Sequence, residues 1–222
     1  MEGVSDVPAV KEVLQRRFGL NESEHFRMHP HQGKGSLPTD ALSRPEPRRK
    51  GLLDQLPSKL RGYARSLPFD AVVLVVIDAD NEPPDQLMGR LQDMLKVLPK
   101  RPNVLFRLAV EETESWFIAD MDALKCAFDG KVNTRVLTGI RPDAIVGAWE
   151  RLAQALRIQP AHVSGATKFE WARLIAPHLN LENPKSPSLK RLIEGVAALD
   201  GMVLFSARQS DVRAAHTLDE QQ

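Results

Sequence analysis

Acidic side chains follow two strongly apolar stretches of the sequence, and they are the residues best suited to carry out chemistry. Asp78 and Asp80 end the stretch 71–80, which reads AVVLVVIDAD, and Glu112 and Glu114 come just after a second apolar stretch. Carboxylate oxygens are the ligands that hard divalent cations prefer. Acidic residues at these places are also common as the start of a loop or of a helix. The pattern alone therefore leaves two alternatives open, a metal site and an ordinary loop.

The two apolar stretches predict buried strands of a parallel sheet. Residues 71–77 are all apolar and mostly Val or Ile, and the second stretch covers 104–110. Neither alternates with polar residues, so helices should cover both faces of the sheet. Residues 83–98 between them have leucines at helical spacing, which predicts a strand–helix–strand unit.

Parallel strands bring their carboxyl ends to the same edge of a sheet, where α/β proteins usually bind ligands. Asp78, Asp80, Glu112 and Glu114 should therefore lie side by side. Like charges that close together repel one another and raise their pKa values unless a cation compensates them. A Mg²⁺ or Mn²⁺ site is the physically coherent explanation.

The beginning of the chain adds another acidic residue. Glu2 stands shortly before a predicted helix at 7–18, where a strand would hand over to a helix. Only Met1 precedes it, whereas a strand has about five or six residues. We therefore expect the true start of the protein to lie upstream of Met1.

A basic, proline-rich segment at 30–50 is predicted to be a loop. It carries Lys34, Arg48, Arg49 and Lys50, and it has four prolines. Such a loop beside a carboxylate cluster could contact phosphates. A solvated insertion without a role is the alternative.

The remaining sequence is mostly helical in pattern. Pro57 should break or restart a helix at 52–67, a short strand is expected at 25–28, and Ser186 should cap a helix that begins at Pro187. The other predicted helices are 121–128, 142–156, 168–179 and 188–199. We predict an α/β core at 1–128, a helical extension packed on it at 129–200, and a flexible tail at 201–222.

Composition narrows the classes of protein. The 222 residues carry a net charge of +1, which argues neither for nor against nucleic acid as a partner. The single cysteine, Cys126, excludes an intramolecular disulfide and fits a reducing cytoplasm, and we expect it to be buried. No stretch is long and apolar enough to predict a membrane span, so we expect a cytoplasmic protein.

The motifs together resemble the Toprim domain, which is shared by topoisomerases, DnaG-type primases and OLD-family nucleases. The resemblance rests on Glu2-Gly3 followed by Asp6, on Asp78-Ala79-Asp80 and on the later acidic strand end. The segments 2–6, 112–116 and 168–171 are closer to a bacterial Toprim-like family, the 4276 family of domains of unknown function. The resemblance covers about residues 1–200 and implies a Toprim-like, Rossmann-like sheet flanked by helices.

This resemblance implies a nuclease. Glu2 would be a metal ligand or general acid/base, Asp78 and Asp80 would hold Mg²⁺ or Mn²⁺, and Lys34 and Lys168 would stabilise charge on phosphate. The closer family implies further metal ligands at Asp6, Glu112 and Glu114. Lys34, Arg48, Arg49 and Lys50 would contact nucleic acid.

The resemblance also implies a setting and partners. Relatives of this kind are often encoded beside an AAA or SMC-like ATPase, so the expected role lies in phage defence or genome maintenance. One alternative is a non-catalytic subunit that binds metal or a nucleotide and serves as sensor or scaffold for such an ATPase. Another is an interaction protein with a helical appendage, whose acidic residues are solvated surface.

Overall fold

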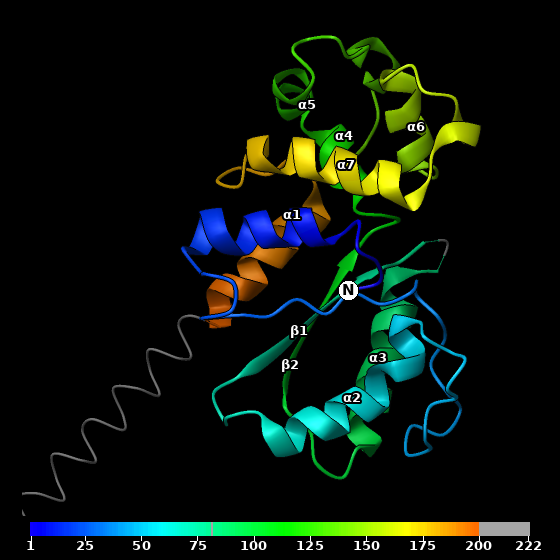
Figure 1. The fold of residues 1–222 in the computed structure, drawn as a ribbon, viewed down its shortest axis with the longest axis vertical. Coiled ribbons are helices and arrows are strands. Elements are labelled where there is room, and N and C mark those ends of the chain that lie inside the picture. The colour runs from blue at the N-terminus through cyan, green and yellow to red at the C-terminus, as the bar shows by residue number, and fades with distance from the viewer. Residues whose placement is uncertain (81, 200–222) are drawn as a thin grey trace, which may run out of the picture.

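A two-stranded parallel sheet lies at the centre of the computed structural model, which describes residues 1–80 and 82–199. Strands β1 (Val72–Asp78) and β2 (Asn103–Ala109) pair from Val72–Asn103 to Asp78–Ala109. Helix α3 (Pro84–Val97) connects them, as the strand–helix–strand prediction requires. The protein is thus a mixed α/β structure with a small parallel sheet flanked by helices (Figure 1).

Alternating side chains of the strands enter two separate apolar cores. Val75 and Ile77 pack with α3 and with α2 (Leu52–Ser66) on one face of the sheet. Val76 and Ala109 face the opposite side, in one core with α1 (Val7–Glu12), its π-helical continuation at Val13–Arg17, and the helix at 187–199. Both faces are covered, which explains why the strands show no polar alternation.

Most of the remaining helices form a lobe beyond the carboxyl end of the sheet (Figure 1). They are α4 (Glu114–Ala119), α5 (Met121–Ala127), α6 (Ala148–Ala155) and α7 (Gly165–Ile175), with 3-10 turns at Thr134–Leu137, Pro160–His162 and Ala176–His178. Their apolar faces join α1 in one core around Trp116, Phe117 and Trp171.

Four local expectations were wrong or only partly right. Pro57 does not break α2, because the buried leucines on both sides of it pack on the sheet and outweigh one lost hydrogen bond. The strand expected at 25–28 is a single bridge between Glu22 and Phe26, since residues 29–33 bond instead to the first two residues of the chain. Cys126 is exposed rather than buried, as it lies on the outer side of α5.

The fourth correction concerns the predicted helix at 142–156, of which only α6 forms. Residues before Ala148 follow a loop because Gly147 has a left-handed φ of +82° and its amide, with that of Ala148, donates to the Glu111 carboxylate. A side chain 36 residues away therefore determines where this helix begins.

The helix at 187–199 begins as predicted. Leu189 N donates to Ser186 Oγ over 3.3 Å, so Ser186 is the cap. Asp143 accepts from the Ser186 and Ser188 hydroxyls at 2.9 and 3.0 Å, and Trp116 Nε1 donates to Ser188 Oγ over 2.8 Å. This buried network joins the helix to the lobe.

The proposed boundary at residue 128 stays a prediction, and the tail predicted at 201–222 lies outside the described residues. Among the residues described, no helix is both long and apolar enough to cross a membrane.

Candidate functional site

The carboxyl ends of β1 and β2 lie side by side, and the acidic residues leave the sheet there. Pairing continues past the strands, since Ala79 N donates to Ala109 O over 2.8 Å and Asp80 N to Glu111 O over 3.0 Å. Asp80 and Glu111 then have left-handed φ values of +49° and +67°, which turn the two chains away from the sheet. The predicted acidic edge is therefore present.

Glu2 reaches this edge without a strand before it. Its Oε1 accepts from Asp78 N over 3.1 Å, and its carbonyl accepts from Gly33 N over 3.0 Å. The carbonyl of Met1 accepts from His31 Nδ1 over 3.0 Å. The loop at 31–33 thus does the positioning that the sequence pattern assigns to a strand.

Asp6 holds the chain start against the second acidic loop. Its carboxylate is only 4% exposed and accepts from Gly3 N at 3.0 Å, Thr113 Oγ1 at 3.3 Å and Ser5 Oγ at 3.4 Å. Thr113 stands between Glu112 and Glu114. Asp6 therefore fixes the position of these two glutamates, and its own oxygens are already occupied.

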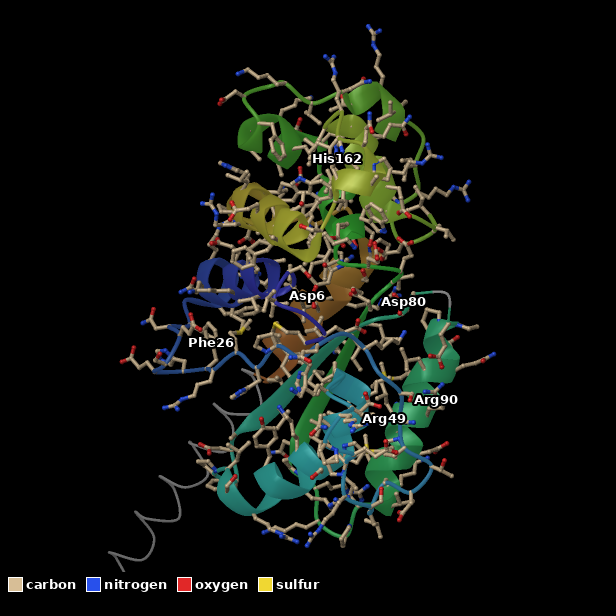
Figure 2. The ribbon with its side chains drawn as sticks, turned by 45° about the vertical axis from the view of Figure 1, so that its right-hand side comes forward. Asp6, Phe26, Arg49, Asp80, Arg90 and His162 are labelled. Carbon is tan, nitrogen blue, oxygen red and sulfur yellow. The ribbon has the colours of Figure 1, made fainter. Side chains whose placement is uncertain are left out.

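Two lysines lie against the carboxylates. Lys34 Nζ donates to Ala79 O over 3.0 Å and to Asp80 Oδ2 over 2.9 Å. Lys168 Nζ, from α7, lies 3.2 Å from Glu112 Oε1 and 3.7 Å from Glu114 Oε1. Figure 2 shows Asp6 and Asp80 at the level where the helical lobe meets the sheet.

A tight contact with α2 positions Lys34. The carbonyls of Gly33 and Lys34 accept from Leu52 N and Leu53 N over 2.8 and 2.7 Å, in the first turn of α2. Gly35 has a φ of +65°, and a Cβ there would stand 2.2 Å from Asp54 Oδ2. The loop can approach the helix this closely only because residue 35 is glycine.

We expect Gly35→Ala to destabilise the protein by about 2–4 kcal/mol, through positive-φ strain plus the clash with Asp54. Gly33→Ala is the matched control, since Gly33 has a φ of +85° but no atom within 4 Å of a Cβ there. Gly33→Ala should be destabilised by the backbone strain alone, which costs about 1 kcal/mol. Urea unfolding measures both, and equal losses would contradict the packing argument.

Burial, and to a smaller extent the crowding of carboxylates, raises the pKa values of the site. Burial, followed by the negative charge of Asp80, raises the pKa of Glu2 to about 8. Burial raises the pKa of Glu114 to about 7, and Lys168 only partly opposes this. Burial also raises the pKa of Asp78 well above its usual range, and the charges of Asp6 and Glu2 add to the effect.

The donor set suits a hard cation, although the described conformation does not enclose one. Glu112 Oε2 is buried and has no hydrogen-bond partner, so one oxygen of this carboxylate stays unsatisfied although Lys168 contacts the other. In the part of the chain that the structure describes, no three acidic, histidine or cysteine side chains converge closely enough to hold a metal ion. The chemistry of the residues fits Mg²⁺ or Mn²⁺, and binding would require carboxylates to exchange their lysine contacts for the ion.

The residues predicted from sequence divide into three groups in the structure. Glu2, Asp6, Asp78, Glu112 and Glu114 act electrostatically on one another, with Lys168 beside them. Asp80 is exposed and faces Lys34, at the outer side of Glu2.

The third group lies on the loop. Arg48, Arg49 and Lys50 are exposed, and Arg49 Nε lies 3.3 Å from Glu46. Among the described residues they form no ion pair with the carboxylates of the cluster, and Figure 2 shows Arg49 apart from Asp6.

Sequence reasoning did not assign two neighbours of the cluster. The first is Trp149, which the sequence pattern places in the core. The centre of its ring lies 5.2 Å from Lys168 Nζ. The charge of Glu150 acts on Glu112, and Glu150 Oε2 is buried without a partner. Both residues belong to α6, and no local signal links that helix to the strand ends.

Comparison with known proteins shows the family. The family model described as "Domain of unknown function (DUF4276)" matches residues 1–197. No curated protein and no solved structure matches the chain. Because the match covers most of the 222 residues, the chain belongs to the DUF4276 family.

Proposed function

We propose that the protein hydrolyses phosphodiester bonds of nucleic acid with the help of Mg²⁺ or Mn²⁺ bound at the carboxylate cluster. The observation that carries the proposal is the excess of buried carboxylates at the end of the sheet, with raised pKa values and an unpartnered Glu112 oxygen. A divalent cation is the group that offsets such a charge.

Glu2, Asp78, Glu112 and Glu114 would hold the ion. A bound divalent ion polarises a phosphate oxygen and lowers the pKa of a water molecule. Lys34 and Lys168 lie on opposite sides of the cluster, where their charges can offset negative charge on the phosphate. Without an ion the pKa of Glu2 is raised to about 8, so Glu2 would release its proton when it binds the ion near neutral pH.

The proposal includes a relationship to the Toprim domain. It also includes a role beside an ATPase in phage defence or genome maintenance. What supports it is the order of acidic motifs on parallel strand ends, with Glu2 next to Asp78.

We expect Lys168→Met to lower the rate of Mn²⁺-dependent cleavage of a labelled oligonucleotide by about 10²–10³-fold, because a charge that stabilises the transition state is lost. The substitution keeps the apolar stem against Trp149. Lys190→Met is the control, since Lys190 is exposed on the helix at 187–199 and its Nζ lies 3.9 Å from Glu194 Oε1. Equal rates for the wild type and Lys168→Met would exclude Lys168 from catalysis.

A second candidate is a metal-binding subunit without catalysis, acting as sensor or scaffold. One observation favours it: Lys168 already lies beside both Glu112 and Glu114, so part of their negative charge is compensated without an ion. In that case Lys168→Met should strengthen metal binding, measured by calorimetry, and no oligonucleotide should be cleaved. Cleavage by the wild type would exclude this candidate.

A further inference from the structure

A surface groove lies beside the carboxylate cluster, on the other side of the chain start. Its volume is about 590 Å³, which is within the usual range for ligand sites. The chain start, the 30–50 loop and α2 all contribute to it. Its polar lining residues are His31, Gln32, Lys50, Gln55 and Lys59, and the others are a valine and three prolines.

The groove is positively charged. Lys50 is exposed at the end of the loop, and Lys59 stands one turn after Gln55 on the same face of α2. The nine described residues that line the groove include no aspartate or glutamate. Arg48 and Arg49 immediately precede Lys50 and extend the basic surface along the loop.

The groove and the carboxylate cluster share one wall. Gln32 lines the groove and bonds through its amide to Lys50 O over 3.2 Å, while the next residue, Gly33, donates to Glu2 O over 3.0 Å. The charge of Lys59 acts on the Met1 amine, on which Glu2 and Asp78 also act. One short segment, 31–33, therefore contacts both the basic groove and the acidic site.

The lining indicates what the groove would bind. Lysines bind phosphates as point charges without regard to base sequence. Among the described residues that line the groove, none is phenylalanine, tyrosine or tryptophan, and His31 offers the one aromatic ring, so phosphate contacts outnumber places where a base could stack. Gln32 and Gln55 add neutral groups that can bond to phosphate or sugar oxygens.

We propose that this groove binds the phosphate backbone of a nucleic-acid strand and leads the adjoining phosphodiester to the carboxylate cluster. The inference rests on the proposed function and deepens it, because it names the surface that holds the substrate. Besides Lys50, which the sequence already singled out, it assigns this role to Lys59, Gln55 and Gln32.

The test is the binding of a fluorescent 12-nucleotide oligo(dT) in EDTA, followed by anisotropy, so that binding is separated from hydrolysis. Lys50→Ala/Lys59→Ala should raise Kd at least tenfold. The slope of log Kd against log salt concentration should fall by about 1.4, since each phosphate contact contributes about 0.7 for a single strand. Lys131→Ala/Lys185→Ala, two exposed lysines of the helical lobe, is the matched control and should change neither value.

Lys50→Glu alone provides a second variant, because Lys50 is exposed and its substitution leaves the packing of α2 intact. An unchanged Kd in both groove variants, or an equal loss in the control, would overturn the inference. So would tight binding of a 12-residue poly-glutamate with the same dependence on Lys50 and Lys59, since the groove would then recognise acidic peptides.

The outcomes also separate the inference from the proposed function. Binding that depends on the groove without cleavage in Mn²⁺ would leave the inference standing and remove the nuclease proposal. If the groove variants cleave with the wild-type rate and KM, the nuclease proposal would stand and the inference about the groove would be overturned. No binding of the oligonucleotide by the wild type would overturn the inference.

Discussion

Asp78→Asn is expected to abolish both metal-dependent stabilisation and metal-dependent cleavage while the protein stays folded. At a hundredfold excess of Mn²⁺ over Kd, the wild type should gain about 2.7 kcal/mol of stability, because the ion binds only the folded state. For a chain of this length that gain corresponds to a rise in Tm of about 5–10 °C. The variant should show no rise, and its cleavage rate should fall by at least about 10²-fold.

The physical reason is the place of Asp78 in the cluster. It ends β1, it accepts no hydrogen bond through its carboxylate among the described residues, and four other acidic groups act on it. Asparagine keeps the shape of the side chain but removes a charge that a cation would need. Without metal at about pH 9, the variant should even be more stable than the wild type, since the repulsion is relieved.

Thermal unfolding with and without Mn²⁺, and a cleavage assay on the same samples, measure these effects. Asp93→Asn is the matched control, because Asp93 is an exposed residue of α3 paired with Lys96. Its metal response and rate should equal those of the wild type. A full Mn²⁺ response in Asp78→Asn would show that the cluster is not the metal site.

The free energy of unfolding is expected to fall as the pH rises from about 4.5 to about 8 in the absence of divalent ions. The pKa of Glu2 is raised from 4.5 to about 8 and that of Glu114 from 4.5 to about 7, with burial as the main cause of both. Between these values the folded state binds more protons than the unfolded state, so stability decreases with pH. The total loss should be on the order of several kcal/mol.

Lys168 does not reverse this trend. Its pKa is raised above 10.5 by Glu114 and Glu112 against the effect of burial, so it stays charged throughout the window. Its contribution to stability is lost only at higher pH, as the pH passes through its folded-state pKa. The carboxylates therefore determine the slope.

Urea unfolding at several pH values in EDTA measures the slope. Glu114→Gln should make it shallower, because the side chain is buried and glutamine does not titrate. Glu24→Gln is the control, since Glu24 is largely exposed, and should leave it unchanged. Added Mn²⁺ should remove the fall at pH 8. Stability that rises with pH over this window would contradict the assignment of the buried carboxyls.

Local patterns were sufficient to predict the elements around the site. An unbroken run rich in β-branched residues, such as 71–77, favours a strand covered on both faces, and a helix between two such runs favours parallel pairing. The two strands therefore end at the same edge of the sheet, and this edge carries Asp78, Glu112 and Glu114. The cap at Ser186 was equally local, because its side chain bonds to an amide three residues on.

Sequence alone determined that the acidic ends of the two strands meet at one edge of the sheet, because strand direction and chain order fix that edge. Only the tertiary structure decided how each one is held. Lys34 and Lys168 reach the carboxylates from 46 and 56 residues away, and Glu111 begins α6 from 36 residues away. Such contacts depend on how separate elements pack against one another, and the spacing of residues along the sequence does not predict that packing.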